Sequence, residues 1–255
     1  MPASLTLTVL DKIPTIVAGD DLAKIALNRA VAQGIFLQAG DVLILAQKIV
    51  SKAEGRFVRL ADVRPSRDAC DLAIRADKDP RIVELILKES ASVVRCRPSV
   101  LVVEHRLGFI LANAGIDASN VEAEKSDEVV LLLPENPDAS AERIRRQLLR
   151  ETGVEVGVVI NDSFGRAWRL GTTGTAIGVA GLPGLVDMRG QKDRTGRVLQ
   201  VTEIGVADEL AAAASLLMGQ ASESRPIIHA RGFPYASREG TAAELLRPKE
   251  LDMFR

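Results

Sequence analysis

The stretch that decides the fold is Val154-Glu155-Val156-Gly157-Val158-Val159-Ile160-Asn161-Asp162-Ser163, in which an almost unbroken apolar run ends in three polar residues. A continuous apolar run without polar alternation is typical of a strand that is covered on both faces of a sheet. We therefore expect a buried strand at residues 154–160. Its end fixes Asn161, Asp162 and Ser163 in place, while a following loop leaves them open to a ligand.

Short β runs and capped helices alternate on both sides of this strand, without a fixed repeat period. Asp, Ser and Pro at helix starts, apolar residues at helical spacing and Gly at a helix end define the predicted helices. These helices lie at residues 21–33, 139–151 and 207–218, with two more that begin near residues 66 and 79. The predicted strands lie at residues 5–9, 42–46, 100–103, 109–111, 129–133 and 227–230. This alternation predicts a mixed α/β or α+β fold.

The composition is that of an ordered globular protein. Of the 255 residues, 47% are hydrophobic and 26% are charged, which excludes a disordered, collagen-like or disulfide-dense chain. The length is sufficient for a full core, divided between two closely joined lobes. The 33 Lys and Arg nearly balance the 34 Asp and Glu, and the aromatic residues are only 6 Phe, 1 Trp and 1 Tyr. General nucleic-acid binding would need excess cations and stacking rings, so we do not expect it.

Three features of the sequence favour a cytoplasmic protein that does not bind membranes. Cys70 and Cys96 lack the spacing of a zinc site or a disulfide framework, which indicates reduced, partly buried thiols. The N-terminal residues show no basic segment followed by an apolar one, so we expect no signal peptide. The uncharged stretch at residues 170–186 holds five Gly, three Thr and a Pro, and is too short and flexible to span a bilayer.

Asp117 and Asp162 are the candidate metal-binding pair. Each follows an apolar run and lies beside small polar residues, where a carboxylate has to be paired, hydrogen-bonded or bound to a cation. A turn or a helix cap is the alternative role for each residue alone. Together they suit Mg²⁺ or Mn²⁺, which complete their coordination with water and phosphate oxygens. Zinc is less suited, because the only imidazoles, His105 and His229, have no ligand partner nearby, and we expect structural roles for both.

Residues 165–197 combine spaced glycines with a local excess of cations. The cations of this segment are Arg166, Arg169, Arg189, Lys192, Arg194 and Arg197. Guanidinium groups and backbone amides of such a segment suit phosphate or carboxylate ligands, and the glycines lower the cost of rearrangement. We expect a mobile lid that orders on an anionic acceptor. A solvated loop, or glycines that serve close backbone packing, are the alternatives.

Several common catalytic motifs are missing from the sequence. It contains neither GxxxxGK[ST] nor a strand-linked GxGxxG, so any nucleotide is held by something other than a P-loop or a Rossmann crossover. It has no GxSxG elbow, and neither cysteine lies beside an obvious base, which argues against covalent catalysis. The residues by themselves support a divalent-metal site for a polyphosphate or acidic substrate.

Five motifs in order along the chain carry a resemblance to a known family. They are AQKIVSKAEG at residues 46–55, NAGID at 113–117 with Asn120, LLP at 132–134, NDSFGR at 161–166, and MGQ at 218–220 with Glu223. With these motifs the chain resembles the coenzyme F420-0:L-glutamate ligase family, GTP-dependent enzymes that add glutamate to a deazaflavin cofactor precursor. The resemblance runs nearly from end to end.

The resemblance implies a fold and a set of partners. The fold is a two-lobed α+β (mixed α/β) type particular to the family, neither P-loop nor Rossmann, in an intertwined homodimer. Residues 1–255 are expected to form one ligase unit without the C-terminal flavin-reductase-like domain of mycobacterial relatives. The implied small molecules are GTP, L-glutamate, the deazaflavin precursor and two divalent cations, Mn²⁺ or Mg²⁺, with K⁺ as a further candidate cation. The implied reaction proceeds through an acyl phosphate formed from the precursor carboxylate and the γ-phosphoryl group.

The resemblance also implies roles for particular residues. The residues that match GTP contacts are Ile13, Pro14, Thr15, Ile16, Gln47, Lys48, Lys52, Asn120, Met218, Gly219, Gln220, Ala221, Ser222, Glu223, Ser224 and Arg225. Asp117 and Asp162 match one metal site, and Ser163 and Gln220 match the second. Lys52 and Arg166 are the candidate catalytic residues that stabilise charge on the γ-phosphate; exposed ion pairs are their alternative role.

Two other functions stay open. One is a related metal- and nucleotide-dependent ligase that uses another amino acid or another carboxylate acceptor. The other is a non-catalytic nucleotide-binding regulator, which would bind GTP without turning it over. The presence of both acidic metal positions favours an enzyme.

Overall fold

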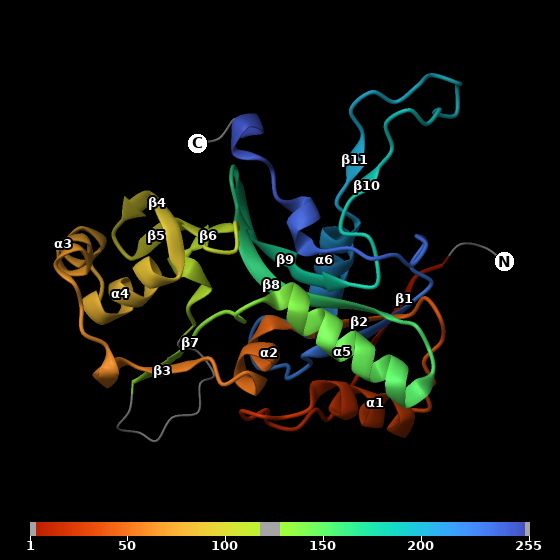
Figure 1. Cartoon of the computed structure of the whole chain (residues 1–255), viewed down its shortest axis with the longest axis horizontal. Helices are drawn as coiled ribbons and strands as arrows, with labels where there is room; N and C mark the ends of the chain where they lie inside the picture. Colours follow the sequence, from red (N-terminus) through yellow and green to blue (C-terminus); the bar gives the residue numbers. More distant parts are fainter. Residues whose placement is uncertain (1–3, 118–127, 253–255) are drawn as a thin grey trace.

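A mixed sheet of five strands forms the centre of the computed structural model, which describes residues 4–117 and 128–252 (Figure 1). The strand order is β1-β12-β2-β8-β9, in which only β2 and β8 run parallel. The bounds are Thr6–Val9 for β1, Val42–Ala46 for β2, Gly157–Arg166 for β8, Arg169–Ala180 for β9 and Ile227–Arg231 for β12. The middle strands β2, β8 and β12 are almost wholly apolar where they pair, because helices cover both faces of the sheet.

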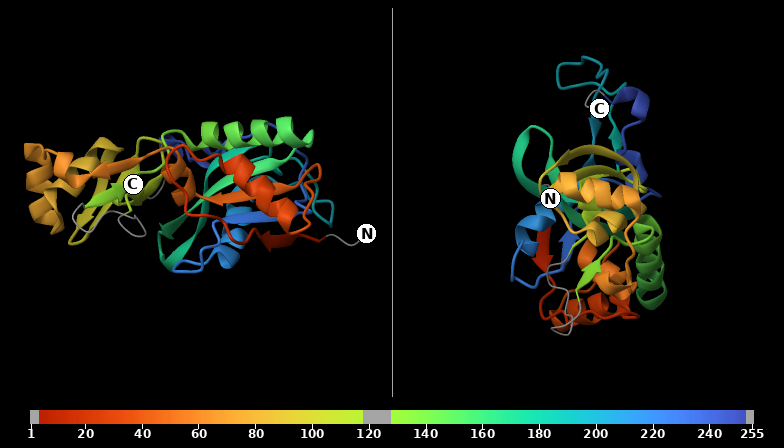
Figure 2. Two further views of the ribbon diagram at one scale, coloured as in Figure 1. Left: turned by 90° about the horizontal axis from the view of Figure 1, so that it is seen from below. Right: turned by 90° about the vertical axis from the view of Figure 1, so that its left-hand side faces the viewer.

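Helices on both faces complete the main core. One face carries α1 (Leu22–Ala32), α2 (Gln47–Ala53) and α5 (Pro137–Thr152), and the other carries α6 (Val206–Met218), as the side view in Figure 2 shows. The N-terminal residues of α1 and α5 are fixed by caps, since the side chains of Asp21 and Asn136 accept hydrogen bonds from the backbone amides of Lys24 and Ala139.

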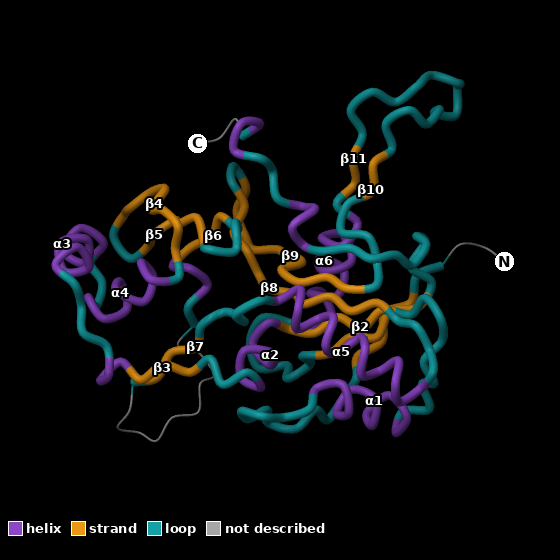
Figure 3. Tube along the Cα trace, viewed as in Figure 1, coloured by secondary structure: helices purple, strands orange, loops and turns teal. Residues whose placement is uncertain are grey.

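A second region with its own core lies beside the central sheet. Its helices are α3 (Arg67–Ala76) and α4 (Pro80–Lys88), and its sheet contains β4 (Ser90–Arg97), β5 (Val100–His105) and β6 (Ile110–Ala112) (Figure 3). Buried apolar side chains such as Val83, Ile86 and Leu101 form a cluster separate from the main core. The short pair β3 (Phe57–Arg59) and β7 (Val129–Leu131) lies between this region and α2.

The remaining elements are short. The two-stranded ladder of β10 (Val186–Asp187) and β11 (Glu203–Ile204) carries a long loop away from the body of the molecule (Figure 1). The 3₁₀ helices are η1 (Leu60–Asp62), η2 (Asn113–Gly115), η3 (Ala242–Leu245) and η4 (Lys249–Leu251). No helix within the described residues is long and apolar enough to cross a membrane.

Most of the helices and strands expected from the sequence are confirmed. The helices beginning near residues 66 and 79 start after Ser66 and Asp79, whose side chains cap them. The expected hairpin at residues 100–111 is the β5–β6 pair. The two histidines are structural, as expected. His229 is buried and its Nε2 lies 2.8 Å from Asp41 Oδ2, while His105 is buried beside Glu89.

The structure differs from the sequence-based expectations in four places. The helix α2 was not expected. The strand expected to stop at Ile160 continues to Arg166, so Asp162 lies within β8 and caps nothing. Strand β4 was not expected, because its residues alternate in exposure without an apolar pattern. Cys70 is exposed, whereas Cys96 is partly buried.

The glycine-rich segment at residues 165–197 also differs from the expectation. Residues 169–180 form β9 of the central sheet, so the expected lid at residues 165–197 does not exist in this part. A side chain on Gly174 would meet the backbone of Ala211 on α6, and one on Gly178 would meet the backbone of Pro137 on α5. Close packing of helices on both faces of β9 therefore explains these glycines.

Candidate active site

The segments matched to GTP and metals meet at one edge of the central sheet. Strand β1 ends opposite Ile228, at the start of β12, so residues 10–16 leave and residues 219–226 arrive at the same edge. The amide of Ala46, the last residue of β2, donates to the carbonyl of Pro226 at 2.8 Å. Parallel pairing then places Asn161 of β8 beside Ala46. Loops from distant parts of the sequence thus converge on the point where β8 carries its polar residues.

Three charged side chains form a compact group at this edge, which we call the carboxylate site: Lys48, Asp117 and Asp162. Lys48 lies in the first turn of α2, and its Nζ is 2.6 Å from Asp117 Oδ2. Asp162 lies close enough for both charges to act on it. Lys52 is one helical turn beyond Lys48, on the same face of α2. The fold therefore brings together four of the residues predicted for the site.

The backbone around Asp117 is held in an unusual conformation. Asn113, Ala114 and Gly115 all have positive φ angles, which are costly for Ala, and Ala114 is fully buried. Asn113 Oδ1 accepts a hydrogen bond from the amide of Leu101. Backbone hydrogen bonds in both directions then join Asp117 to Leu131. These contacts fix the carboxylate of Asp117 toward α2.

The environment of Asp162 disfavours its charge. Burial raises the pKa of Asp162 to about 6, and the neighbouring Asp117 carboxylate acts in the same direction. Two groups lower the pKa of Asp162: the amide of Ser163, which donates to Asp162 Oδ1, and the charge of Lys48. Their effect is smaller than the increase caused by burial and Asp117. A bound cation would remove this cost.

The donor set fits a hard divalent cation. No group of three or more His, Cys, Asp and Glu suited to a metal occurs in residues 4–117 and 128–252. Mg²⁺ and Mn²⁺ need only one or two carboxylates, which Asp117 and Asp162 supply. Asn161 is not part of this donor set. Its side chain lies on the opposite face of the sheet from Asp162, where its Nδ2 donates to Ser215 Oγ of α6 at 3.0 Å.

The residues matched to GTP differ in how accessible they are. Residues 220–225 are exposed, and the carboxylate of Glu223 shapes their loop by accepting a hydrogen bond from the amide of Ala221. Pro14 and Thr15 are exposed as well, whereas Ile16 is buried. Gln47 is 4% exposed and its Nε2 donates to Ser51 Oγ, so its side chain supports α2 in this structure.

Arg166 and Gln220, which were predicted for the site, are not joined to the carboxylate site in the described structure. Arg166 lies four residues beyond Asp162, roughly 13 Å along the strand, and its Nη2 donates to the carbonyl of Leu170. Gln220 follows the end of α6. This end of the helix contacts β8, since Asn161 Nδ2 lies 3.3 Å from Met218 Sδ. The structure shows no contact between Gln220 and Ser163. Asn120 lies outside the described residues.

Sequence reasoning missed one feature of the site. It assigned Lys48 to GTP alone, but the structure pairs this residue with Asp117, which is far away in the sequence. Nothing in the sequence indicates this ion pair. Asn161, which the sequence placed with Asp162 as a residue open to a ligand, has its side chain against α6 instead.

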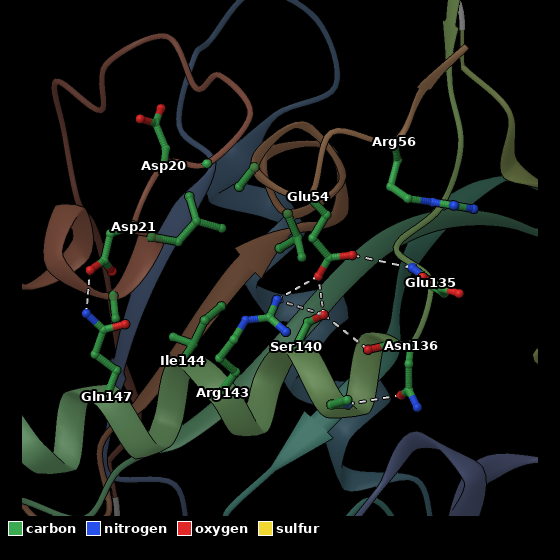
Figure 4. Close-up of a pocket in the computed structure, with 16 residues that line it drawn as sticks. Asp20, Asp21, Glu54, Arg56, Glu135, Asn136, Ser140, Arg143, Ile144 and Gln147 are labelled. Atoms are coloured by element: carbon green, nitrogen blue, oxygen red, sulfur yellow. Dashed lines mark hydrogen bonds and ion pairs between the residues drawn. The ribbon is translucent and has the colours of Figure 1, made fainter.

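One pocket of the structure lies apart from the carboxylate site. It has a volume of about 640 Å³, lies between α1, α2 and α5, and is lined by none of the residues predicted for the site (Figure 4). Its polar side chains bond to one another. Glu54 contacts both Ser140 and Arg143, and Gln147 contacts Asp21. These contacts join the three helices and leave the carboxylate site as the candidate centre of chemistry.

The structure thus places two carboxylates, two lysines and exposed loops at one end of the central sheet. The family model described as F420-0:Gamma-glutamyl ligase matches residues 11–232. Curated relatives named coenzyme F420:L-glutamate ligase match almost the whole chain. The relative from Methanothermobacter thermautotrophicus is 46% identical over 98% of this chain and 99% of its own. The relative from Methanopyrus kandleri is 45% identical over 93% of this chain and 92% of its own. The relative from Archaeoglobus fulgidus is 42% identical over 96% of this chain and 94% of its own.

The chain therefore belongs to the F420-0:gamma-glutamyl ligase family, and it is a ligase. The resemblance found in the five motifs is confirmed.

Proposed function

We propose that this chain adds L-glutamate to the carboxylate of the deazaflavin precursor of coenzyme F420, with GTP as the phosphoryl donor. Family membership supports the substrate class, because curated relatives that match nearly the full length carry the name coenzyme F420:L-glutamate ligase. The observation that carries the proposal is the carboxylate site itself. It unites Lys48, Asp117 and Asp162 where the loops matched to GTP converge.

The reaction joins three anions, so neutralisation of charge dominates the chemistry. A precursor carboxylate oxygen attacks the γ-phosphorus, and the bond to the β-phosphate oxygen breaks to release GDP. The amine of glutamate then attacks the acyl carbon of the acyl phosphate, loses a proton and expels phosphate. One amide bond forms for each GTP converted to GDP and phosphate.

Residues of the carboxylate site have separate roles in this scheme. Lys48 holds Asp117 in place through their ion pair and carries positive charge toward the incoming phosphates. Lys52, one turn away on α2, stabilises charge on the γ-phosphate. Asp117 and Asp162 would hold a divalent cation, and Ser163 and Gln220 are the residues matched to a second one. Bound Mg²⁺ or Mn²⁺ would neutralise phosphate charge and orient the γ-phosphoryl group.

Isotope transfer tests the acyl phosphate directly. The precursor is labelled with ¹⁸O in its terminal carboxylate and incubated with the protein, GTP, glutamate and Mn²⁺, and the phosphate released is analysed by mass spectrometry. We expect one ¹⁸O atom in each phosphate and a product heavier by one glutamyl unit. Unlabelled phosphate with normal product would exclude the acyl phosphate. Binding of GTP without turnover would favour the regulator instead.

We also propose that the chain acts as a homodimer. Two exposed features support an interface. At the turn between β8 and β9, Trp168 and Leu170 are 86% and 97% exposed, and the loop carried by β10 and β11 projects from the body (Figure 1). Large apolar side chains that lie exposed together favour contact with another protein surface. Light scattering of the purified protein should give about twice the mass of one chain.

A further inference from the structure

A small pocket opens where the second region meets the β8–β9 hairpin. It has a volume of about 260 Å³ and is lined by Phe109 from the β5–β6 turn, Phe164 of β8, and Leu245 and Leu246 of the C-terminal segment. Figure 1 shows this segment passing the β8–β9 hairpin. Three parts of the chain that are distant in sequence thus enclose one cavity.

The lining of this pocket suits a flat aromatic ring. The rings of Phe109 and Phe164 meet edge to face, with centroids 5.9 Å apart at an angle of 66°. Leu245 and Leu246 supply apolar surface from another direction, and Leu246 packs closely against Gly108. Pockets for small molecules combine apolar and aromatic walls with a few polar groups. A fused heteroaromatic ring matches such walls better than a charged amino acid does.

The polar groups of the pocket suit an imide. Asp208, near the start of α6, accepts a hydrogen bond from the amide of Ala176 through Oδ1, the only bond found for its carboxylate within the described residues. The second oxygen is then available to an N–H group of a ligand. The pyrimidinedione ring of a deazaflavin presents such an N–H between two carbonyls. Arg247 at the exposed rim has the sign to attract an anionic side arm.

The pocket begins next to the carboxylate site. Thr175, which lines it, pairs directly across the sheet with Asp162, so their Cβ atoms lie about 5 Å apart. Phe164 lies two residues beyond Asp162 on the same face of β8, about 7 Å along the strand. A ligand whose ring occupies the pocket can therefore extend a flexible arm to Asp162.

The segment matched to GTP lies at the far end of α6 from the pocket. Asp208 lies in the first turn of α6, whereas residues 219–225, matched to GTP, follow the last turn. A helix of 13 residues separates these ends by roughly 20 Å. Guanine held near residues 219–225 cannot also fill the pocket. The pocket is thus placed for the other large substrate.

We propose that this pocket, lined by Phe109, Phe164, Leu246 and Asp208, binds the ring system of the deazaflavin acceptor. The phosphate arm then leads along β8 and delivers the terminal carboxylate to Asp162. This inference rests on the proposed function, because it concerns the acceptor of that reaction. It adds a binding site that none of the five motifs contains in full.

Filling the pocket tests the proposal. Leu246→Trp places a large side chain in the cavity, and Leu251→Trp is the matched control, since Leu251 belongs to the same segment, is 64% exposed and does not line the pocket. For Leu246→Trp we expect the KM for the acceptor to rise by roughly 5- to 150-fold, the range for losing one ring stacked on an aromatic side chain. The KM values for GTP and glutamate should stay within about twofold of the parent values. An unchanged KM for the acceptor would overturn the proposal.

A binding measurement separates the pocket from the reaction. The probe is 5-deazariboflavin, which has the ring and the ribityl chain but no phosphate or carboxylate, and its fluorescence anisotropy reports binding without GTP or metal. The parent protein and Leu251→Trp should bind the probe, and Leu246→Trp should lose binding. Asp208→Asn, which retains the oxygen that accepts from Ala176, provides a second variant with less change of volume and should weaken binding several-fold.

Failure of the pocket proposal and failure of the proposed function give different results. If the probe binds as expected but no glutamylated product forms, the pocket stands and the proposed function is wrong. If product forms while Leu246→Trp and Asp208→Asn both bind the probe as the parent protein does, the proposed function stands and the ring binds elsewhere. A folding defect in Leu246→Trp would appear in its circular dichroism spectrum, and Asp208→Asn then decides the question.

Discussion

Replacing Asp162 by Asn should stabilise the metal-free protein while removing its activity. The carboxylate of Asp162 is held near Asp117 in a partly buried setting that raises its pKa from 3.8 to about 6. A difference of about two pKa units corresponds to about 3 kcal/mol of unfavourable free energy for the charged form. Because Asp162 keeps partial exposure to solvent, we expect a gain of about 1–3 kcal/mol in the free energy of unfolding.

The pH dependence of this gain follows from the direction of the shift. The folded pKa lies above the unfolded value, so the parent protein has its full stability from this group below about pH 4 and loses it as the pH rises through about 6. The asparagine has no charge at any pH. The advantage of Asp162→Asn should therefore be absent near pH 4 and reach its full size near pH 8.

Urea unfolding in EDTA at several pH values measures this advantage. Asp187→Asn is the control, because Arg189 lowers the pKa of Asp187 and the exposed substitution should give no gain at any pH. The same variant of Asp162 should lose ligase activity by a factor on the order of 10² or more, as for loss of a key electrostatic group. An advantage independent of pH, or activity close to that of the parent, would refute the placement of Asp162 as a charged cation ligand.

Three further predictions concern the nucleotide, the histidine site and β9. GTP with Mn²⁺ at about 100 times its Kd should stabilise the protein by about 2.7 kcal/mol, raising the Tm by about 2–4 °C per kcal/mol, and ATP should do much less; equal shifts in differential scanning fluorimetry would contradict the guanine preference. Arg231 and His229 hold the pKa of the buried Asp41 below its usual range despite desolvation, so its contribution to stability is present above about pH 4 and is lost as the pH falls further. Asp41→Asn should cost about 3 kcal/mol near pH 7 and less in acid, and an equal cost at both pH values in urea unfolding would refute the charge argument. Gly174→Ala should destabilise the protein by about 1–3 kcal/mol because its Cβ meets α6, whereas Gly165→Ala, with open space around it, should be nearly neutral; similar Tm values for both would contradict the close packing of β9.

Much of the site could be located from the sequence, but its geometry could not. The motifs around Lys48, Asp117 and Asp162 identify residues, and the structure shows that these three meet. Their meeting depends on the parallel pairing of β2 with β8 and on the backbone bonds between Asp117 and Leu131. Such pairings join residues far apart in the chain, and no local pattern encodes them. The ring pocket has the same origin, since its walls come from the β5–β6 turn, the β8–β9 hairpin, α6 and the C-terminal segment.

The sequence by itself determined the local elements of this protein, and the tertiary structure decided what those elements do. Caps at Asp21, Ser66, Asp79 and Asn136 act within a few residues, so the helices that they begin were readable from the chain. The strand at residues 169–180 could not be predicted from the sequence. Its glycines suggest a flexible segment, but in the fold they allow α5 and α6 to pack closely on the two faces of β9. Local hydrogen bonds and side-chain spacing depend only on neighbouring residues. Burial, close approach and the charge of Asp162 depend on which distant segments the fold brings together.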